Sequence, residues 1–156
     1  GRRVVDGIAD PLARLRDAHD NIVGTKEFTA DMGKASLTRV KLGEDFLMLS
    51  GEDMTALAFN AHGGSGCISV TSNVAPRLCA QMQEASLSGD FATALTIQDK
   101  LVYLHKNLFL EPNPQAVKYA ANRLNLVRNE LRLPLVQVTP ATAEAVDFAL
   151  SHAGLL

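Results

Sequence analysis

The alternation of short apolar runs with helical stretches constrains this chain more than any other feature of its sequence. Strand-like runs occur near residues 22–26, 45–50 and 67–70, and stretches with apolar side chains at helical spacing separate them. Because parallel strands need crossover helices between them, this order predicts an α/β fold with a parallel sheet. After Gly89 the periodicity is helical to the end. We therefore expect an α/β part over residues 1–88 and a helical domain over residues 89–156.

Capping residues predict where several helices begin and end. Asp10-Pro11 and Thr139-Pro140 each put a capping residue before a proline, which is typical of a helix start. A helix is expected over residues 31–41, and Gly43 marks its end. Ser50, followed by Asp53 three residues later, indicates a capping box that opens another helix.

Composition excludes several classes of function. The 156 residues carry 15 Lys and Arg against 17 Asp and Glu, with no basic block, so we expect no nucleic-acid partner and no membrane surface. The apolar runs are far shorter than a membrane span needs, and no signal-peptide pattern is present. Cys67 and Cys79 lack metal-ligand spacing, which favours a reducing cytoplasm and a structural role for both thiols.

Three strand-helix units are too few for a closed fold. An α/β barrel closes with eight parallel strands, whereas an open sheet of three would keep unpaired edges and poorly covered apolar faces. The chain is therefore expected to be part of a larger α/β structure.

Lys26 is a candidate reactive amine. On a strand it shares one face with Ile22 and Gly24, and it stands where the strand ends. The carboxyl ends of barrel strands gather active sites, and a buried lysine there has a lowered pKa and can attack a ketone to form an imine. From position alone, a solvated lysine remains the commoner role.

Other polar motifs are compatible with structural roles. Arg2 and Arg3 could clamp a carboxylate, although a pair of arginines in a loop is more often solvated. The run from Gly63 to Gly66 precedes a strand and lacks the lysine of a phosphate loop, so it is interpreted as a helix stop. Surface or capping roles are expected for His62, His105 and His152, and a structural turn is expected at Glu111 and Asn113.

Seven short motifs, in order and approximate spacing, together resemble the second half of the dihydrodipicolinate synthase family. The resemblance extends over essentially the whole chain. Each motif is weak singly, but their combination is specific. The motifs are Gly1-Arg2-Arg3, Ile22 to Glu27, Leu49 to Asp53, Gly63 to Val70, Glu111 to Pro114, Leu131 to Pro134 and His152 to Leu156.

The resemblance implies a fold and an activity. The fold would be the C-terminal portion of a (β/α)8 barrel, with about its last three strands, followed by a C-terminal helical domain. The family condenses pyruvate with aspartate semialdehyde in lysine biosynthesis, in the cytoplasm, without a cofactor or metal other than the covalent pyruvate imine. It usually forms a tetramer assembled from dimers.

The resemblance also assigns roles to four residues. Lys26 would form the Schiff base with pyruvate, and Arg2 would hold the carboxylate of the second substrate. Gly51 and Ile68, at the ends of the next two strands, would line the pocket. The related sialic-acid lyases lack an arginine in this motif, so Arg2 favours the synthase.

The chain departs from the family pattern in two respects. The family's proton-relay residues belong to the first half of the barrel, so the isolated chain is expected to be inactive and to need that half as a partner. Thr25 stands where an aliphatic residue is common. Two alternatives stay open: another pyruvate-dependent aldolase, such as a sialic-acid or sugar-acid lyase, and a catalytically silent half-barrel that serves as an assembly module.

Overall fold

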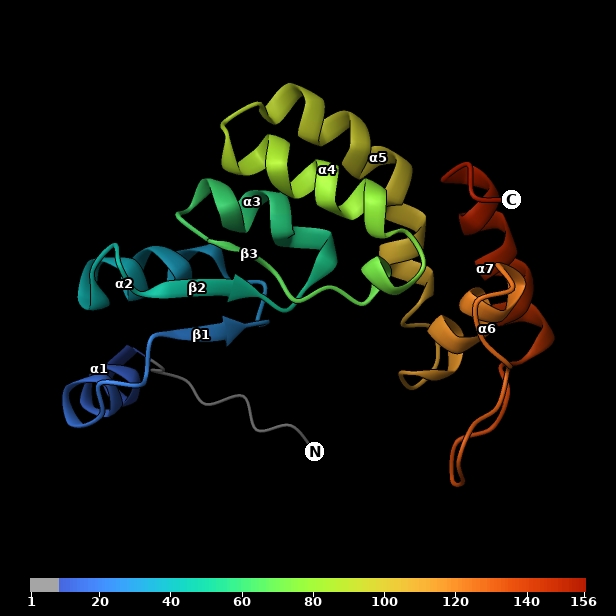
Figure 1. Ribbon diagram of the computed structural model, residues 1–156, viewed down its shortest axis with the longest axis horizontal. Coiled ribbons are helices and arrows are strands. Elements are labelled where there is room, and N and C mark those ends of the chain that lie inside the picture. The colour runs from blue at the N-terminus through green and yellow to red at the C-terminus, as the bar shows by residue number, and fades with distance from the viewer. Residues whose placement is uncertain (1–8) are drawn as a thin grey trace. The chain divides into compact units, whose positions relative to one another are not determined.

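The computed structural model describes residues 9–156, and its sheet contains three short parallel strands (Figure 1). They are β1 (Gly24–Glu27), β2 (Leu47–Ser50) and β3 (Gly66–Cys67), hydrogen-bonded in the order β1-β2-β3. The predicted parallel α/β arrangement is confirmed. The third strand is shorter than expected and begins one residue earlier, because only Gly66 and Cys67 pair with β2.

The chain divides into two compact units, residues 1–68 and residues 69–156. Helix α4 (Pro76–Leu87) packs extensively against α5 (Phe91–Asn107), so it belongs to the second unit. The predicted boundary after residue 88 would divide the barrel of the complete protein from its helical domain, and it stays a prediction.

The first unit buries one face of its sheet. The unit contains helices α1 (Ala9–Ala18), α2 (Met32–Leu42) and α3 (Ala56–Ala61), with the 3-10 helix η1 (Asp53–Thr55) before α3. Its core consists of buried apolar side chains from α2, α3 and the region of β2, which are less than about 5% exposed. These residues are Ala35, Leu42, Phe46, Met48 and Phe59.

Local hydrogen bonds explain which helix starts were predicted correctly. Asp31 caps α2 by accepting from the backbone N–H groups of Gly33 and Lys34, and Gly43 ends that helix with φ 85°. The helix predicted from Asp10 begins at Ala9 instead. Ser50 does not cap a helix; it is the last residue of β2, and Glu52 caps η1 through the backbone N–H of Met54.

The second unit is helical (Figure 1). It contains the larger apolar core. After the 3-10 helix η2 (Thr71–Asn73) and the pair α4 and α5 come α6 (Gln115–Arg123) and α7 (Pro140–His152). Thr139 caps α7 through the backbone N–H of Thr142, as predicted. Fully buried side chains from three helices form the centre of this core. They include Leu101 and Leu104 of α5, Ala116 and Ala120 of α6, and Val146, Ala149 and Leu150 of α7; Leu108, directly after α5, is buried with them.

Candidate active site

Three of the four predicted site residues lie at the carboxyl ends of neighbouring strands. Lys26 is the third residue of β1, Gly51 follows β2 directly, and Ile68 follows β3 directly. The Gly51 N–H donates to the Glu27 carbonyl at 2.6 Å, and the Ile68 N–H donates to the Ser50 carbonyl at 2.8 Å. The sheet therefore continues hydrogen bonding through Gly51 and Ile68, and all three positions share one edge.

The side chain of Lys26 lies beside Gly51. A Cβ added to Gly51 would be 2.5 Å from Lys26 Cε and 3.3 Å from Lys26 Cγ. Lys26 pairs with Leu49 in the sheet, so both side chains leave the face opposite to Met48, which is buried in the core. Lys26 itself is exposed on that second face. The structure thus brings the candidate amine next to one of its predicted neighbours.

The other two predicted residues differ in what the structure shows of them. Arg2 lies outside the described residues, so its role as a carboxylate clamp stays a prediction. Ile68 is 47% exposed, at the same sheet edge as Lys26. Its position is compatible with lining a pocket at this edge.

Hydrogen bonds between residues two apart in the sequence hold the segments that follow β1 and β2. The Thr29 N–H donates to Glu27 Oε1 at 2.6 Å. Ser50 Oγ donates to the Glu52 carbonyl at 3.0 Å and accepts from the Glu52 N–H at 3.1 Å. These local bonds turn the chain immediately after each strand, while the register of β1 and β2 sets the backbone of Gly51 next to the end of β1.

Phe28 is a neighbour of this site that sequence reasoning missed. Its Cβ lies 2.8 Å from the position that a Cβ on Gly51 would take, and its side chain is 41% exposed. The signal was present, since Phe28 stands two residues after Lys26 and alternation predicts that both share a face. What the sequence could not indicate is that Gly51 would lie against both residues.

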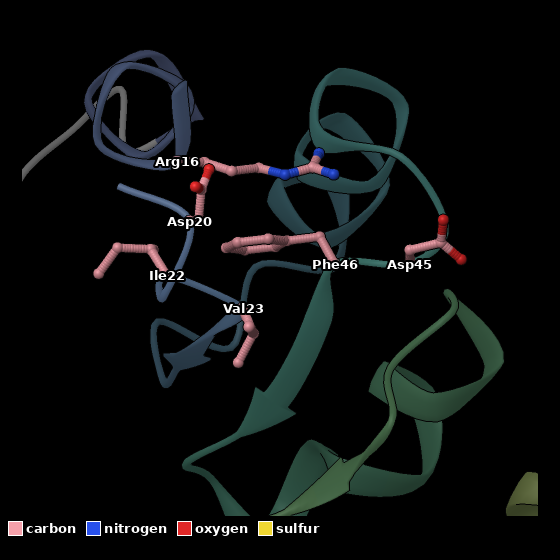
Figure 2. A pocket seen from close by; sticks show the side chains of 6 residues that line it. All are labelled: Arg16, Asp20, Ile22, Val23, Asp45 and Phe46. Carbon is pink, nitrogen blue, oxygen red and sulfur yellow. The ribbon is translucent and has the colours of Figure 1, made fainter. Parts of the chain in front are cut away.

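A pocket of about 280 Å³ lies elsewhere in the first unit, and Figure 2 shows its lining. Val23 and Phe46 precede β1 and β2, so this pocket is at the amino ends of the strands, away from Lys26. The Arg16 guanidinium donates to the Leu42 carbonyl and lies 5.8 Å from the centre of the Phe46 ring. Since the amino end of such a sheet usually serves stability, we do not assign catalysis to this pocket.

The described residues also show how candidate metal ligands and the glycine run are arranged. Within residues 9–156, no group of three or more His, Cys, Asp or Glu side chains is arranged to hold a metal ion. The run from Gly63 to Gly66 does follow α3 and lead into β3, with φ 91° at Gly63 and φ 140° at Gly66.

None of the helices within residues 9–156 has the length and apolar composition needed to cross a bilayer.

The histidines correct one prediction. His62 and His152 are exposed, and they contact Ser36 Oγ and the Asp99 carbonyl respectively. His105 is 1% exposed, and its Nδ1 lies 2.8 Å from Thr71 Oγ1. The surface role expected for His105 is therefore wrong, because α5 turns this residue into the core of the second unit.

The clear electrostatic perturbations belong to the second unit. Hydrogen bonds from the Thr139 backbone and the Thr142 side chain hold the pKa of Glu111 below its usual value. Burial raises the pKa of the Tyr119 hydroxyl, and the negative charge of Asp147 raises it further. Arg123 donates from Nε to Asp147 at 2.7 Å. These contacts join α6 to α7 and the segment before α6 to the start of α7, which is a structural role.

Comparison with known proteins identifies the family. Residues 5–153 match the model of the dihydrodipicolinate synthetase family. The chain belongs to that family. Curated dihydrodipicolinate synthetase relatives include the 4-hydroxy-tetrahydrodipicolinate synthases of a Chelativorans species, at 58% identity over 99% of this chain, and of Afipia carboxidovorans, at 56% identity over the whole chain.

Solved structures of the dihydrodipicolinate synthetase family agree with the fold. The enzyme from Aquifex aeolicus matches with a TM-score of 0.90 and 38% identity, over 94% of this chain and 50% of that one. A monomeric dihydrodipicolinate synthase variant matches with a TM-score of 0.91 and 36% identity, over all of this chain and 53% of that one. The three strands and their helices are therefore consistent with a partial barrel.

The matched region is about half of each relative. The chain spans 53% of the Chelativorans protein and 52% of the Afipia protein. The activity, substrates and partners of the whole enzyme therefore do not follow from the family alone.

Proposed function

We propose that this chain carries the Schiff-base lysine of a synthase that condenses pyruvate with L-aspartate 4-semialdehyde to 4-hydroxy-tetrahydrodipicolinate, in lysine biosynthesis. The observation that carries the proposal is the position of Lys26, at the strand edge it shares with Gly51 and Ile68. Identity of 53–58% to curated synthases across the chain supports the same activity.

The chemistry follows from an amine at this edge. The neutral amine of Lys26 adds to the ketone carbon of pyruvate, and loss of water together with uptake of one proton gives a protonated imine. The imine withdraws electrons, so the neighbouring methyl group loses a proton and becomes an enamine. The enamine carbon then attacks the aldehyde carbon of the second substrate, and the aldehyde oxygen takes up a proton. The amino group of the second substrate then adds to the imine carbon and displaces the lysine amine, which closes the six-membered ring of 4-hydroxy-tetrahydrodipicolinate. The covalent imine is therefore the only group required.

Three other residues have supporting roles in the proposal. Arg2 holds the carboxylate of aspartate semialdehyde through charge-assisted hydrogen bonds. Gly51 and Ile68 line the pyruvate pocket beside Lys26, which agrees with their place at the ends of β2 and β3. Arg2 favours the synthase over lyases that act on sugar acids.

The complete protein, in this proposal, consists of this chain and the half of the fold that it lacks. The chain supplies about the last three strands of a (β/α)8 barrel and a C-terminal helical domain. The first half supplies the acid-base residues and covers the face on which Lys26 is exposed. We further propose a homotetramer made of two dimers, located in the cytoplasm.

Borohydride trapping tests the proposal. The complete protein is incubated with pyruvate and reduced, and the added mass is located by peptide mapping. We expect one adduct, on Lys26, and none in Lys26→Arg, because a guanidinium is not nucleophilic at neutral pH. An adduct on another lysine would refute the assignment. A Lys26 adduct with faster turnover of sugar-derived aldehydes than of aspartate semialdehyde would indicate a lyase, and no adduct at all would favour an assembly module.

A further inference from the structure

Gly51 leaves a space that the stem of Lys26 occupies. The position of an added Cβ lies 2.5 Å from Lys26 Cε, 3.3 Å from Lys26 Cγ and 2.8 Å from Phe28 Cβ. Carbon atoms in ordinary contact are about 3.5–4.0 Å apart. A methyl group on Gly51 would therefore overlap both the lysine stem and the fixed Cβ of Phe28.

The backbone does not explain why this residue is a glycine. The described glycines with positive φ are Gly43, Gly63, Gly66, Gly89 and Gly154, and Gly51 is not among them. The Gly51 N–H donates a sheet-like hydrogen bond to the Glu27 carbonyl at 2.6 Å. An alanine could adopt this conformation, so the restriction on Gly51 comes from the side chains beside it.

Gly24 has a different reason to be a glycine. An added Cβ there would lie 2.6 Å from the Leu47 carbonyl oxygen and 2.8 Å from Leu47 Cβ, on the adjacent strand. That contact concerns the spacing of β1 and β2. At Gly51, in contrast, the nearest atom belongs to the residue assigned as the nucleophile.

We propose that Gly51 is a positioning residue, and that its missing side chain provides the slot, bounded by Phe28 Cβ, in which the stem of Lys26 lies. This inference rests on the proposed function, in which the Lys26 amine attacks pyruvate. Cε carries the reactive nitrogen, so a group that displaces Cε also displaces the nucleophile. A misplacement of about 1 Å can lower a rate by about a hundredfold.

The first test compares Gly51→Ala with the parent in the complete protein. We expect pyruvate trapping at Lys26 to slow by about tenfold to a hundredfold, while the thermal unfolding curve stays cooperative. Gly33→Ala is the matched control, because an added Cβ there meets only the Asp31 carboxylate, at 3.2 Å. Trapping at the parent rate in Gly51→Ala would overturn the proposal.

A second variant separates the two contacts at Gly51. Phe28→Gly combined with Gly51→Ala removes the Phe28 Cβ from the slot, so it relieves that overlap if Gly51→Ala alone fails to fold. Because the new methyl group still meets Lys26 Cε, we expect the double variant to fold and to trap pyruvate slowly. Recovery of the parent rate would show that Phe28, and not the lysine, requires the glycine.

A third measurement does not depend on pyruvate. Limited acetylation with acetic anhydride, quantified for each lysine by mass, reports how accessible each amine is. In Gly51→Ala we expect the yield at Lys26, relative to that at Lys106, an exposed lysine of α5, to change by about twofold or more, because the methyl group moves the stem of Lys26 out of its slot. An unchanged ratio would refute the slot. A parent that forms no pyruvate adduct would refute the proposed function, and this ratio would still test the slot.

Discussion

Glu111 shows how single hydrogen bonds set the properties of one residue. Its Oε1 accepts from both the backbone N–H and the hydroxyl of Thr139, each at 2.9 Å, and Gln115 Nε2 donates to its Oε2 at 3.2 Å. Hydrogen bonds from the Thr139 backbone, and then from the Thr142 and Thr139 side chains, favour the carboxylate form and lower the pKa of Glu111 from 4.5. The sequence had indicated only a structural turn between two prolines. Glu111 therefore ties that turn to the start of α7.

The lowered pKa predicts how stability depends on pH. A carboxyl group with a depressed folded-state pKa stabilises the fold above its unfolded pKa, and this contribution is lost as the pH falls through the folded-state value. Glu111→Gln should therefore melt at a lower temperature than the parent above pH 4.5, with a difference that disappears in stronger acid. Thermal unfolding across this range is the measurement.

Glu144→Gln on α7 provides the control, because it removes an exposed glutamate without touching Thr139. A melting difference for Glu111→Gln that is the same at every pH would contradict the role of the charge.

At the scale of elements, α5 combines a buried side with an exposed one. Leu101 and Leu104 are fully buried in the core of the second unit, whereas Leu95 is 52% exposed. The helical spacing of apolar residues after Gly89 predicted helical structure here, but spacing alone does not distinguish Leu95 from Leu104. Only the packing of the neighbouring helices separates them.

This difference gives a matched pair of substitutions on one helix. Leu104→Ala should lower the free energy of unfolding by about 2–5 kcal/mol, because it leaves a cavity in a closely packed core. Leu95→Ala should change the free energy of unfolding by less than about 0.5 kcal/mol. Urea unfolding of the complete protein measures both, and equal losses for the two variants would show that α5 is not oriented as described.

At the scale of the whole molecule, the chain corresponds to about half the length of its relatives. It spans 53% of its Chelativorans relative, and its sheet contains only three strands within the described residues. In our proposal, the catalytic lysine and the acid-base residues belong to different halves.

The isolated chain should therefore turn over aspartate semialdehyde and pyruvate at least about a hundredfold more slowly than the complete protein. The reason is that positioned acid-base groups contribute about 10²–10⁴-fold to such reactions. A coupled assay of product formation, with Lys26→Arg in the complete protein as the blank, is the measurement. Activity of the isolated chain close to that of the complete protein would contradict the division of the site between two halves.

The sequence by itself determined the features that depend on neighbouring residues. Alternation and helical spacing predicted the parallel α/β order and the end position of Lys26, while Asp31 and Thr139 marked helix starts correctly. These features follow from hydrogen bonds and side-chain directions within a few residues. The order of the seven motifs along the chain also indicated the family.

The tertiary structure decided whatever depends on residues far apart in the chain. Strand register brings Gly51 beside Lys26 and Phe28, helix packing buries His105, and Ser50 pairs within β2 instead of capping a helix. Periodicity cannot reveal such contacts, because register and packing are set by the summed fit of many side chains. The space beside Gly51, occupied by the stem of Lys26, is visible only once β1 and β2 are aligned.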